Sequence, residues 1–178
     1  MPAAEATPRR ITGIVVHCSA SSWGDAATIR RWHTDPPPKG RGWKDIGYHY
    51  VVLGGRRTSR VAYAPADDGW IELGRDLDRD GDVGEEIGAH TLEVNRSTLG
   101  VCLIGNLAAD FTPRQIATAA GLVAGLCMRF GLSADQVRGH NEYPSGAHKA
   151  CPVISMVDFR ARVASLLAAW LAAGGATA

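Results

Sequence analysis

Apolar runs separated by glycine, proline and charged residues divide the chain into short strands and helices. Residues 11–17 (ITGIVVH) are apolar and rich in β-branched side chains, which is typical of a buried strand ending at a histidine. Residues 46–55 and 98–106 predict two more buried strands. The glycine pair that ends residues 46–55 predicts a turn into a further strand over residues 59–64. Residues 74–86 are polar and acidic, and predict a surface loop.

The clearest helix is predicted over residues 112–131. Thr112 is suited to the N-cap, Pro113 to the first helical position, and Gln115 to the third position of a capping box. Gly131 is a typical helix stop. Apolar residues at spacings of three and four predict an inward face made of Ile116, Ala119, Ala120, Val123, Leu126 and Cys127.

Two shorter patterns predict helices over residues 25–33, with Asp25 as N-cap, and over residues 155–171. Strands mixed with helices in a chain of 178 residues indicate one α/β domain, in which helices flank a central mixed β-sheet. We expect this domain to cover residues 11–172. The expected flanks are a flexible N-terminal lead over residues 1–10 and a frayed tail over residues 173–178.

The net charge and the hydropathy of the chain argue against two kinds of partner, nucleic acid and the membrane interior. The net charge is +1, whereas a domain that binds nucleic acid by electrostatics is normally strongly basic. No uninterrupted apolar run reaches the length of a membrane span. The N-terminus lacks a cationic region followed by an apolar one, so no export signal is expected. The sequence therefore predicts neither a nucleic-acid partner nor a membrane span.

The four cysteines show no spacing typical of disulfide pairs. Cys102 and Cys127 lie in apolar surroundings, and we expect both to be packed in the core. Cys18 follows His17 in a predicted strand. Since neighbours in a strand point to opposite faces, we expect Cys18 to belong to the core and not to act as a fourth ligand.

The segment GHNEYPSGAHKACP (residues 139–152) holds an unusual number of metal-capable side chains in one loop. Catalytic zinc takes nitrogen and sulfur ligands, three from the protein, and keeps a position open for water. His140 and Cys151 could approach one ion because the Gly- and Pro-rich stretch between them can bend. His17, at a strand end, is a candidate third ligand, although a lone histidine there is more often a hydrogen-bonded structural residue.

Several motifs occur together in a set order: IVVHCSAS, IRRWH, GWKDIGYHYVV, IGAHTLEVNRSTLGVCLIGN, GHNEY and KACP. In this order they resemble the zinc N-acetylmuramoyl-L-alanine amidase family (amidase type 2). That family includes the phage T7 lysozyme-type endolysins and the peptidoglycan recognition proteins. The resemblance extends over residues 11–171, nearly the whole chain.

The resemblance implies a Zn²⁺ ion held by His17, His140 and Cys151, with Tyr48 and Lys149 as catalytic residues. Tyr48 could act as a base or as a hydrogen-bond donor. The resemblance also places His33 and His90 along the substrate groove, where His90 could instead make a structural hydrogen bond. Two further histidines have no implied chemical role: His49 is expected to be structural and His148 to be an exposed loop residue.

The implied activity is hydrolysis of the amide bond between the lactyl group of N-acetylmuramic acid and L-alanine, with peptidoglycan as the partner. A monomeric phage or prophage endolysin would collect in the host cytoplasm and reach the wall in the periplasm after a holin opens the membrane. Some members bind peptidoglycan without cutting it, but these typically lack the cysteine ligand, which is present here as Cys151. T7-like members can also bind phage RNA polymerase, a partner on which the sequence is silent. A cysteine hydrolase using Cys18 or Cys151 is the remaining enzymatic alternative.

The acidic loop raises one further hypothesis. DLDRDGDVGEE begins with the D-x-D-x-D-G pattern of a calcium loop, so Asp76, Asp78 and Asp80 are candidate Ca²⁺ ligands. The glutamate expected at loop position 12 is replaced by Ile87, and the flanks do not resemble the helices of an EF-hand. A solvated acidic loop is the simpler interpretation.

Overall fold

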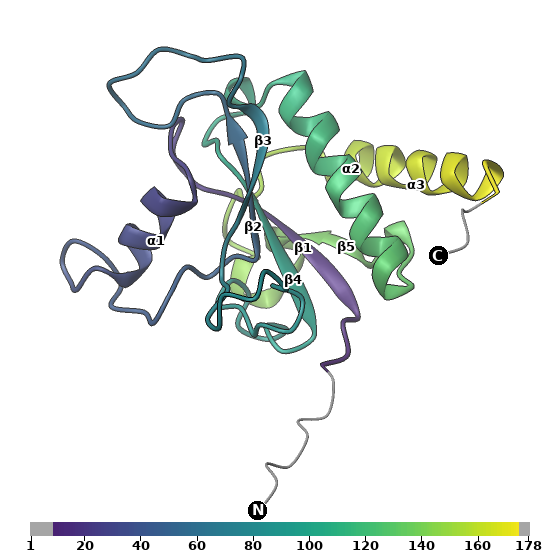
Figure 1. Ribbon diagram of the computed structural model, residues 1–178, viewed down its shortest axis with the longest axis horizontal. Helices are drawn as coiled ribbons and strands as arrows, with labels where there is room; N and C mark the ends of the chain where they lie inside the picture. The colour runs from purple at the N-terminus through teal and green to yellow at the C-terminus, as the bar shows by residue number, and fades with distance from the viewer. Residues whose placement is uncertain (1–8, 175–178) are drawn as a thin grey trace, which may run out of the picture.

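The computed structural model describes residues 9–174, which form one mixed β-sheet with helices on both faces (Figure 1). The strands lie in the order β3-β2-β4-β1-β5. Strand β4 runs parallel to both of its neighbours, β1 runs parallel to β5, and β3 pairs with β2 in the antiparallel direction. The bounds of the strands are β1 Gly13–Cys18, β2 Tyr50–Gly54, β3 Asp68–Leu73, β4 Thr98–Leu103 and β5 Val137–Gly139. The predicted α/β architecture is confirmed.

The helices begin and end where their capping residues indicate. The carboxylate of Asp25 accepts a hydrogen bond from the Thr28 N–H at 2.7 Å, and Gly131 takes the left-handed conformation after α2. The bounds are α1 Ala26–Thr34, α2 Pro113–Phe130 and α3 Met156–Ala172. Four single 3-10 turns are η1 Ala108–Asp110, η2 Ala134–Gln136, η3 His140–Glu142 and η4 Pro144–Gly146.

The sheet separates two apolar clusters. The larger cluster packs α2 and α3 against one face, with alternate strand residues such as Ile14, Val16 and Leu99. The smaller packs α1 against the other face, with Val51 and Cys102. Figure 1 shows this arrangement, with α1 on one side of the sheet and α2 and α3 on the other. Side chains alternate along a strand, so His17, which follows Val16, faces the side of α1.

Two details differ from the sequence-based predictions. The strand predicted over residues 59–64 is a loop, and the partner of β2 is formed later, by β3. In this loop Tyr63 is largely exposed, and its hydroxyl donates to the carboxylate of Asp68 at the start of β3. The second difference concerns Gln115, which does not complete a capping box. Its amide donates instead to the carbonyls of Val52 and Ile104, at 3.0 and 2.9 Å.

The described part of the N-terminal lead is bonded to the domain. The guanidinium of Arg9 donates to the backbone carbonyls of Asn95, Arg96 and Thr98. The expected lead at residues 1–8 and the tail at residues 175–178 lie outside the described residues. Within residues 9–174 no helix combines the length and the apolar character that crossing a bilayer requires.

Candidate metal centre and active site

Two adjacent parallel strands bring His17 and His140 together. Val16 of β1 is paired with Gly139, the last residue of β5, and each of the two is followed by a histidine, His17 in β1 and His140 at the start of η3. The two imidazole rings lie 4.6 Å apart between centroids. Because the strands run parallel, residues 123 positions apart along the chain leave the sheet at the same end.

Cys151 lies close to the two histidines because hydrogen bonds hold it against the residues that follow each of them. The Asn141 N–H donates to the Cys151 carbonyl at 2.9 Å, and the Cys18 N–H points at the Cys151 sulfur at 3.2 Å. Gly146 allows the loop to pass close to His140, since a Cβ at this position would lie 2.0 Å from the His140 carbonyl oxygen. The Cys151 sulfur is thereby held 3.8 Å from Nδ1 of His17.

The donor atoms of His17, His140 and Cys151 suit a zinc ion. All three lie within 4.8 Å of one another. A tetrahedral zinc ion would separate a sulfur and a nitrogen ligand by about 3.6 Å, close to the distance between Cys151 and His17. Burial lowers the pKa of His17 and of His140, which keeps both imidazoles in the neutral form that binds metals.

His90 contacts the ring nitrogen of His17 that does not face Cys151. Its Nδ1 lies 3.1 Å from Nε2 of His17 and 3.1 Å from the Thr91 hydroxyl. The His90 ring fits against the sheet because position 100 is a glycine, where a Cβ would come within 2.7 Å of the ring. Of the two roles considered for His90, the structural hydrogen bond is therefore present, although the ring also lines the pocket.

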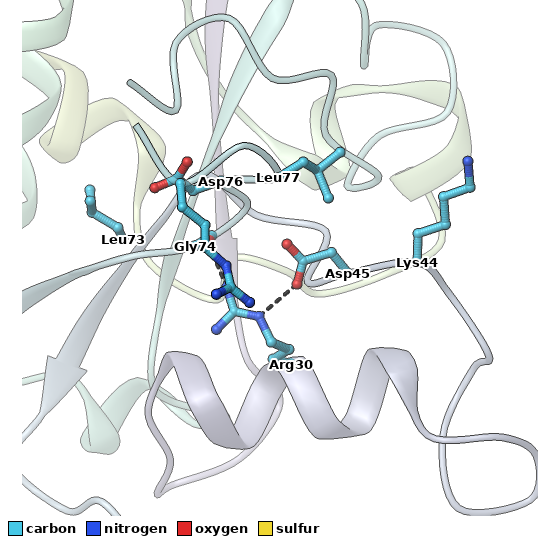
Figure 2. Close-up of a pocket in the computed structure, with 8 residues that line it drawn as sticks. Arg30, Lys44, Asp45, Leu73, Gly74, Asp76 and Leu77 are labelled. Carbon is cyan, nitrogen blue, oxygen red and sulfur yellow. Dashed lines mark hydrogen bonds and ion pairs between the residues drawn. The ribbon is translucent and has the colours of Figure 1, made fainter. Parts of the chain in front are cut away.

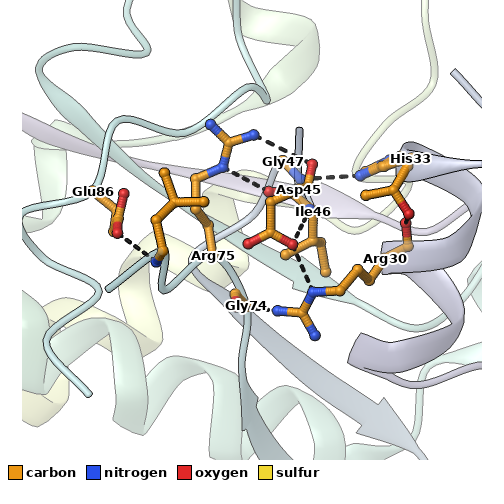
Figure 3. Close-up of polar contacts among 10 residues, drawn as sticks. Arg30, His33, Asp45, Ile46, Gly47, Gly74, Arg75 and Glu86 are labelled. Atoms are coloured by element: carbon orange, nitrogen blue, oxygen red, sulfur yellow. Dashed lines mark hydrogen bonds and ion pairs between the residues drawn. The ribbon is translucent and has the colours of Figure 1, made fainter. Parts of the chain in front are cut away.

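Two of the three candidate ligands, His140 and Cys151, line a pocket of about 350 Å³, and His17 is buried next to them. The pocket lining also includes Tyr48, His33 and Lys149. The Tyr48 ring lies 5.0 Å from the His17 ring, and burial raises the pKa of its phenol. Nδ1 of His33 accepts the Gly47 N–H at 3.0 Å, as Figure 3 shows. Burial also lowers the pKa of His33 to about 4. His33 is therefore neutral at pH 7, with its proton on Nε2.

Cys18 is buried, as expected, but it also contacts the site. It lies at the last position of β1, where the sheet ends, and it lines the pocket instead of joining either core cluster. It is not one of the three converging donors. Cys102 and Cys127 lie in the core as expected.

The two histidines without a predicted chemical role behave as expected. His49 is fully buried, and its two ring nitrogens contact the Gly100 N–H and the Glu86 carbonyl. His148 is exposed and lies outside the pocket lining.

Part of the pocket wall carries no prediction from the sequence. Trp32, Trp43 and Arg41 line it, with the Arg41 guanidinium 5.2 Å from the centre of the Trp43 ring. Trp32 and Trp43 belong to the IRRWH and GWKDIGYHYVV motifs, so their position beside motif histidines was the available signal. Arg41 lies in the proline- and glycine-rich loop before Trp43, where no sequence signal identified it.

A second pocket, of about 600 Å³, shares no lining residue with the first and contains none of the predicted site residues except Asp76 (Figure 2). Arg30 crosses it to reach the Asp45 carboxylate at 2.6 Å and the Gly74 carbonyl at 2.7 Å. Arg75 is buried, and it donates to the carbonyls of Ile46 and Asp45, as Figure 3 shows. It also donates to the Ile87 carbonyl. These bonds join α1 to the segments that precede β2 and follow β3.

The acidic loop uses its carboxylates for its own backbone. Asp78 and Asp80 each accept the N–H of the residue two positions later, and Glu86 accepts the Leu77 N–H at 2.6 Å. Asp76 accepts the Gly81 N–H. Carboxylates do cluster here, but nothing beyond their proximity favours an ion. The predicted Ca²⁺ site at Asp76, Asp78 and Asp80 is unsupported.

Comparison with known proteins agrees with this geometry. The chain is 32% identical to the endolysin of Enterobacteria phage T3 over 155 residues, covering 82% of this chain and 83% of that protein. It is 31% identical to the endolysin of Escherichia phage T7 over 148 residues, covering 78% of each.

Solved structures share the fold. The N-acetylmuramoyl-L-alanine amidase LysC from Clostridium intestinale superposes with a TM-score of 0.66 at 20% identity, covering 92% of this chain and 94% of that one. Drosophila PGRP-LB superposes with a TM-score of 0.58 at 20% identity, covering 94% and 85%. The profile of the N-acetylmuramoyl-L-alanine amidase family matches residues 7–153. The chain is therefore a member of the N-acetylmuramoyl-L-alanine amidase family.

Proposed function

We propose that this amidase is a zinc-dependent endolysin that hydrolyses the bond between the lactyl group of N-acetylmuramic acid and L-alanine. The observation that carries the proposal is the convergence of His17, His140 and Cys151, two of which, His140 and Cys151, line a pocket together with Tyr48 and Lys149. A non-catalytic binding module would have no need of a thiolate ligand or of a cation beside it.

Zinc held by these three residues would polarise the scissile carbonyl and lower the pKa of a water molecule, so that hydroxide is available near neutral pH. Lys149 lies two residues before Cys151 and projects from the same loop into the pocket lining. Its positive charge would stabilise the oxyanion that forms when the amide carbonyl is attacked. Tyr48, whose ring lies beside that of His17, would donate a hydrogen bond to the attacking water or to that oxyanion.

His90 would act as a positioning residue. Nδ1 of His17 faces the Cys151 sulfur, so Nε2 of His17 would carry the proton and donate it to Nδ1 of His90. This bond fixes the tautomer and the orientation of the His17 ring. The Asn95 side chain holds His90 in place by accepting the backbone N–H groups of His90 and Thr91, both at 2.8 Å.

His33 would bind the substrate through the free side of its ring. Its Nδ1 is already bonded to Gly47, which leaves an Nε2–H donor for a carbonyl of the peptide. The relatives in phages T3 and T7 are named endolysins, and on this basis we propose that the natural substrate is the wall of a host bacterium. The protein would then collect in the host cytoplasm and act on the wall in the periplasm after it is released through the inner membrane. It would act as a monomer.

Digestion of purified sacculi tests the proposal. We expect new L-alanine amino termini without new reducing sugar ends, one zinc per chain, and loss of both zinc and activity with EDTA that added Zn²⁺ reverses. His140→Ala should abolish zinc binding. His148→Ala removes an exposed histidine from the same loop and should retain both zinc and activity. Activity that survives chelation would indicate a thiol hydrolase, and cut sugar bonds would indicate a glycosidase.

A further inference from the structure

The pocket beside the metal ligands contains more positive charge than the hydrolysis reaction requires. Its lining includes two cations, Arg41 and Lys149, and no aspartate or glutamate among the described residues. The nearby carboxylates are already bonded elsewhere. Asp45 pairs with Arg30, and Glu93 accepts both the N–H and the hydroxyl of Ser145, at 2.7 Å each. Lys149 has a role in the reaction, whereas Arg41 has none.

Arg41 is held at the pocket by the loop that carries it. The residues on either side are glycines packed against the end of α1: Gly42 donates its N–H to the Asp35 carbonyl at 2.9 Å, and a Cβ on Gly40 would lie 2.4 Å from the same oxygen. Gly42 also has a φ of 68°, which side chains other than glycine rarely adopt. The Trp43 N–H then donates to the His33 carbonyl at 2.8 Å.

The guanidinium of Arg41 is oriented without being neutralised. It stacks over the Trp43 ring, and no ion pair of Arg41 exists within residues 9–174. An arginine stacked on an aromatic ring keeps its N–H donors free for a planar, bidentate partner such as a carboxylate. The arrangement is therefore that of a recognition group ready to bind an anion.

The proposed substrate places its anionic groups on one side of the scissile bond. The lactyl carboxyl of N-acetylmuramic acid is consumed in the scissile amide, and N-acetylated sugars are neutral. Free carboxylates occur on the peptide side only, on the second residue, D-isoglutamate, and on a third residue such as diaminopimelate. A cation that binds the intact substrate must therefore contact the stem peptide.

We propose that Arg41 is a specificity-determining residue that binds a free carboxylate of the stem peptide. This assignment rests on the proposed function. It also orients the substrate, because the peptide then runs from the metal ligands towards Trp43 and Arg41, and the glycan leaves on the other side.

Synthetic muramyl tripeptides test the assignment. All three have diaminopimelate as residue three with its C-terminal carboxyl capped as an amide, so the free carboxylates are one on residue two and one on the side chain of residue three. One substrate carries both of these carboxylates, a second has the carboxylate of residue two amidated, and a third has the side-chain carboxylate of residue three amidated. Each is given to the zinc-loaded wild type, to Arg41→Gln, and to Lys39→Gln, which removes one charge from an exposed position of the same loop outside the pocket. Release of L-alanine amino termini gives kcat and KM.

We expect Arg41→Gln to raise KM for the fully charged substrate about fivefold to tenfold with little change in kcat. A loss of this size is expected when one partly exposed hydrogen bond between charged groups is removed. The wild type should lose the same factor on one of the two amidated substrates, which identifies the carboxylate, and Arg41→Gln should be insensitive to that amidation. Lys39→Gln should match the wild type. Equal losses on amidation in the wild type and in Arg41→Gln would overturn the assignment, as would wild-type kinetics of Arg41→Gln. If the wild type cleaves none of the three substrates, the proposed function itself fails.

Discussion

His17 uses both nitrogens of its ring, one directed at Cys151 and the other at His90. Such a pair is common at metal sites, because a second bond fixes the ring that binds the ion and increases its basicity. A substitution of His90 should therefore change the zinc affinity of the site although His90 is not a ligand.

His90→Ala removes the acceptor for the proton of His17 Nε2. We expect the zinc affinity to fall by about 10- to 100-fold, measured by competition with a chromophoric chelator. The zinc-free protein should stay folded, as its circular dichroism spectrum will report. His148→Ala is the matched control, since it removes an exposed histidine outside the pocket. An unchanged zinc affinity in His90→Ala would remove the positioning role.

Lys149→Ala separates the chemistry from metal binding. Lys149 is not one of the converging donors, so zinc content should be unchanged. The loss of charge beside the oxyanion should lower kcat by about 100-fold with a smaller effect on KM. Lys39→Ala, in an exposed loop, should leave kcat unaltered. A kcat within twofold of the wild type would exclude the oxyanion role for Lys149.

The candidate zinc ligands could be identified from sequence because their residue types are rare and chemically specific, and because the motifs occur in a fixed order. The contact between His17 and His90 could not, since 73 residues separate them and only the folded sheet brings them together. Arg41 was missed for a related reason. Its significance depends on the glycines that press its loop against Asp35 and on the absence of acidic residues from the pocket lining.

At the scale of elements, helix α2 is joined to the sheet by one buried amide. Gln115 is fully buried, and its side-chain amide donates to carbonyls of both Val52 in β2 and Ile104 beyond β4. The sequence placed Gln115 in a capping box because the spacing from Thr112 is correct, and the Thr112 hydroxyl does accept the Gln115 N–H at 2.9 Å. Sequence spacing describes the helix alone, whereas the sheet offers the amide two buried carbonyls.

Gln115→Ala should lower the free energy of unfolding by about 2 kcal/mol, because it leaves the buried carbonyl of Ile104 without its side-chain donor, whereas the Val52 carbonyl keeps the Ile104 N–H. Urea denaturation of the zinc-free protein measures this value without a contribution from metal binding. Gln136→Ala is a matched control, since its amide donates to the Thr12 carbonyl at an exposed position and should cost about 1 kcal/mol or less. Equal losses in the two variants would show that burial adds nothing to the Gln115 bonds.

The missed strand has a comparable cause at this scale. The glycine pair after β2 indicated a tight turn, but Gly55 instead accepts a bond from the Ala64 N–H across a wider loop. The antiparallel partner of β2 then begins at Asp68, whose buried carboxylate accepts the hydroxyls of Tyr63 and Thr112. Strand propensity in residues 59–64 was thus overridden by polar contacts with residues outside that segment.

At the scale of the whole molecule, several histidines are buried, among them His33 in α1 and His49 just before β2, and this makes folding sensitive to acid. Burial lowers the pKa of His33 and of His49 to about 4. In the unfolded chain each returns to about 6.5. Between these values the unfolded state binds more protons than the folded state, so stability must fall as the pH is lowered from about 6.5 towards 4.

Urea unfolding of the zinc-free protein, carried out at pH values from about 7.5 to about 4.5, measures this dependence. A chelator keeps the protein free of zinc and so removes the separate effect of protons on zinc binding. Each of the two histidines should contribute up to about 1.4 kcal/mol per pH unit below pH 6.5, with little change above it. His33→Asn removes one titrating ring while keeping an acceptor for the Gly47 N–H, so its slope should be smaller by about that amount. If the slope of His33→Asn equals that of the wild type, His33 takes up its proton in the folded protein as readily as in the unfolded chain, and burial of His33 cannot contribute to the acid sensitivity.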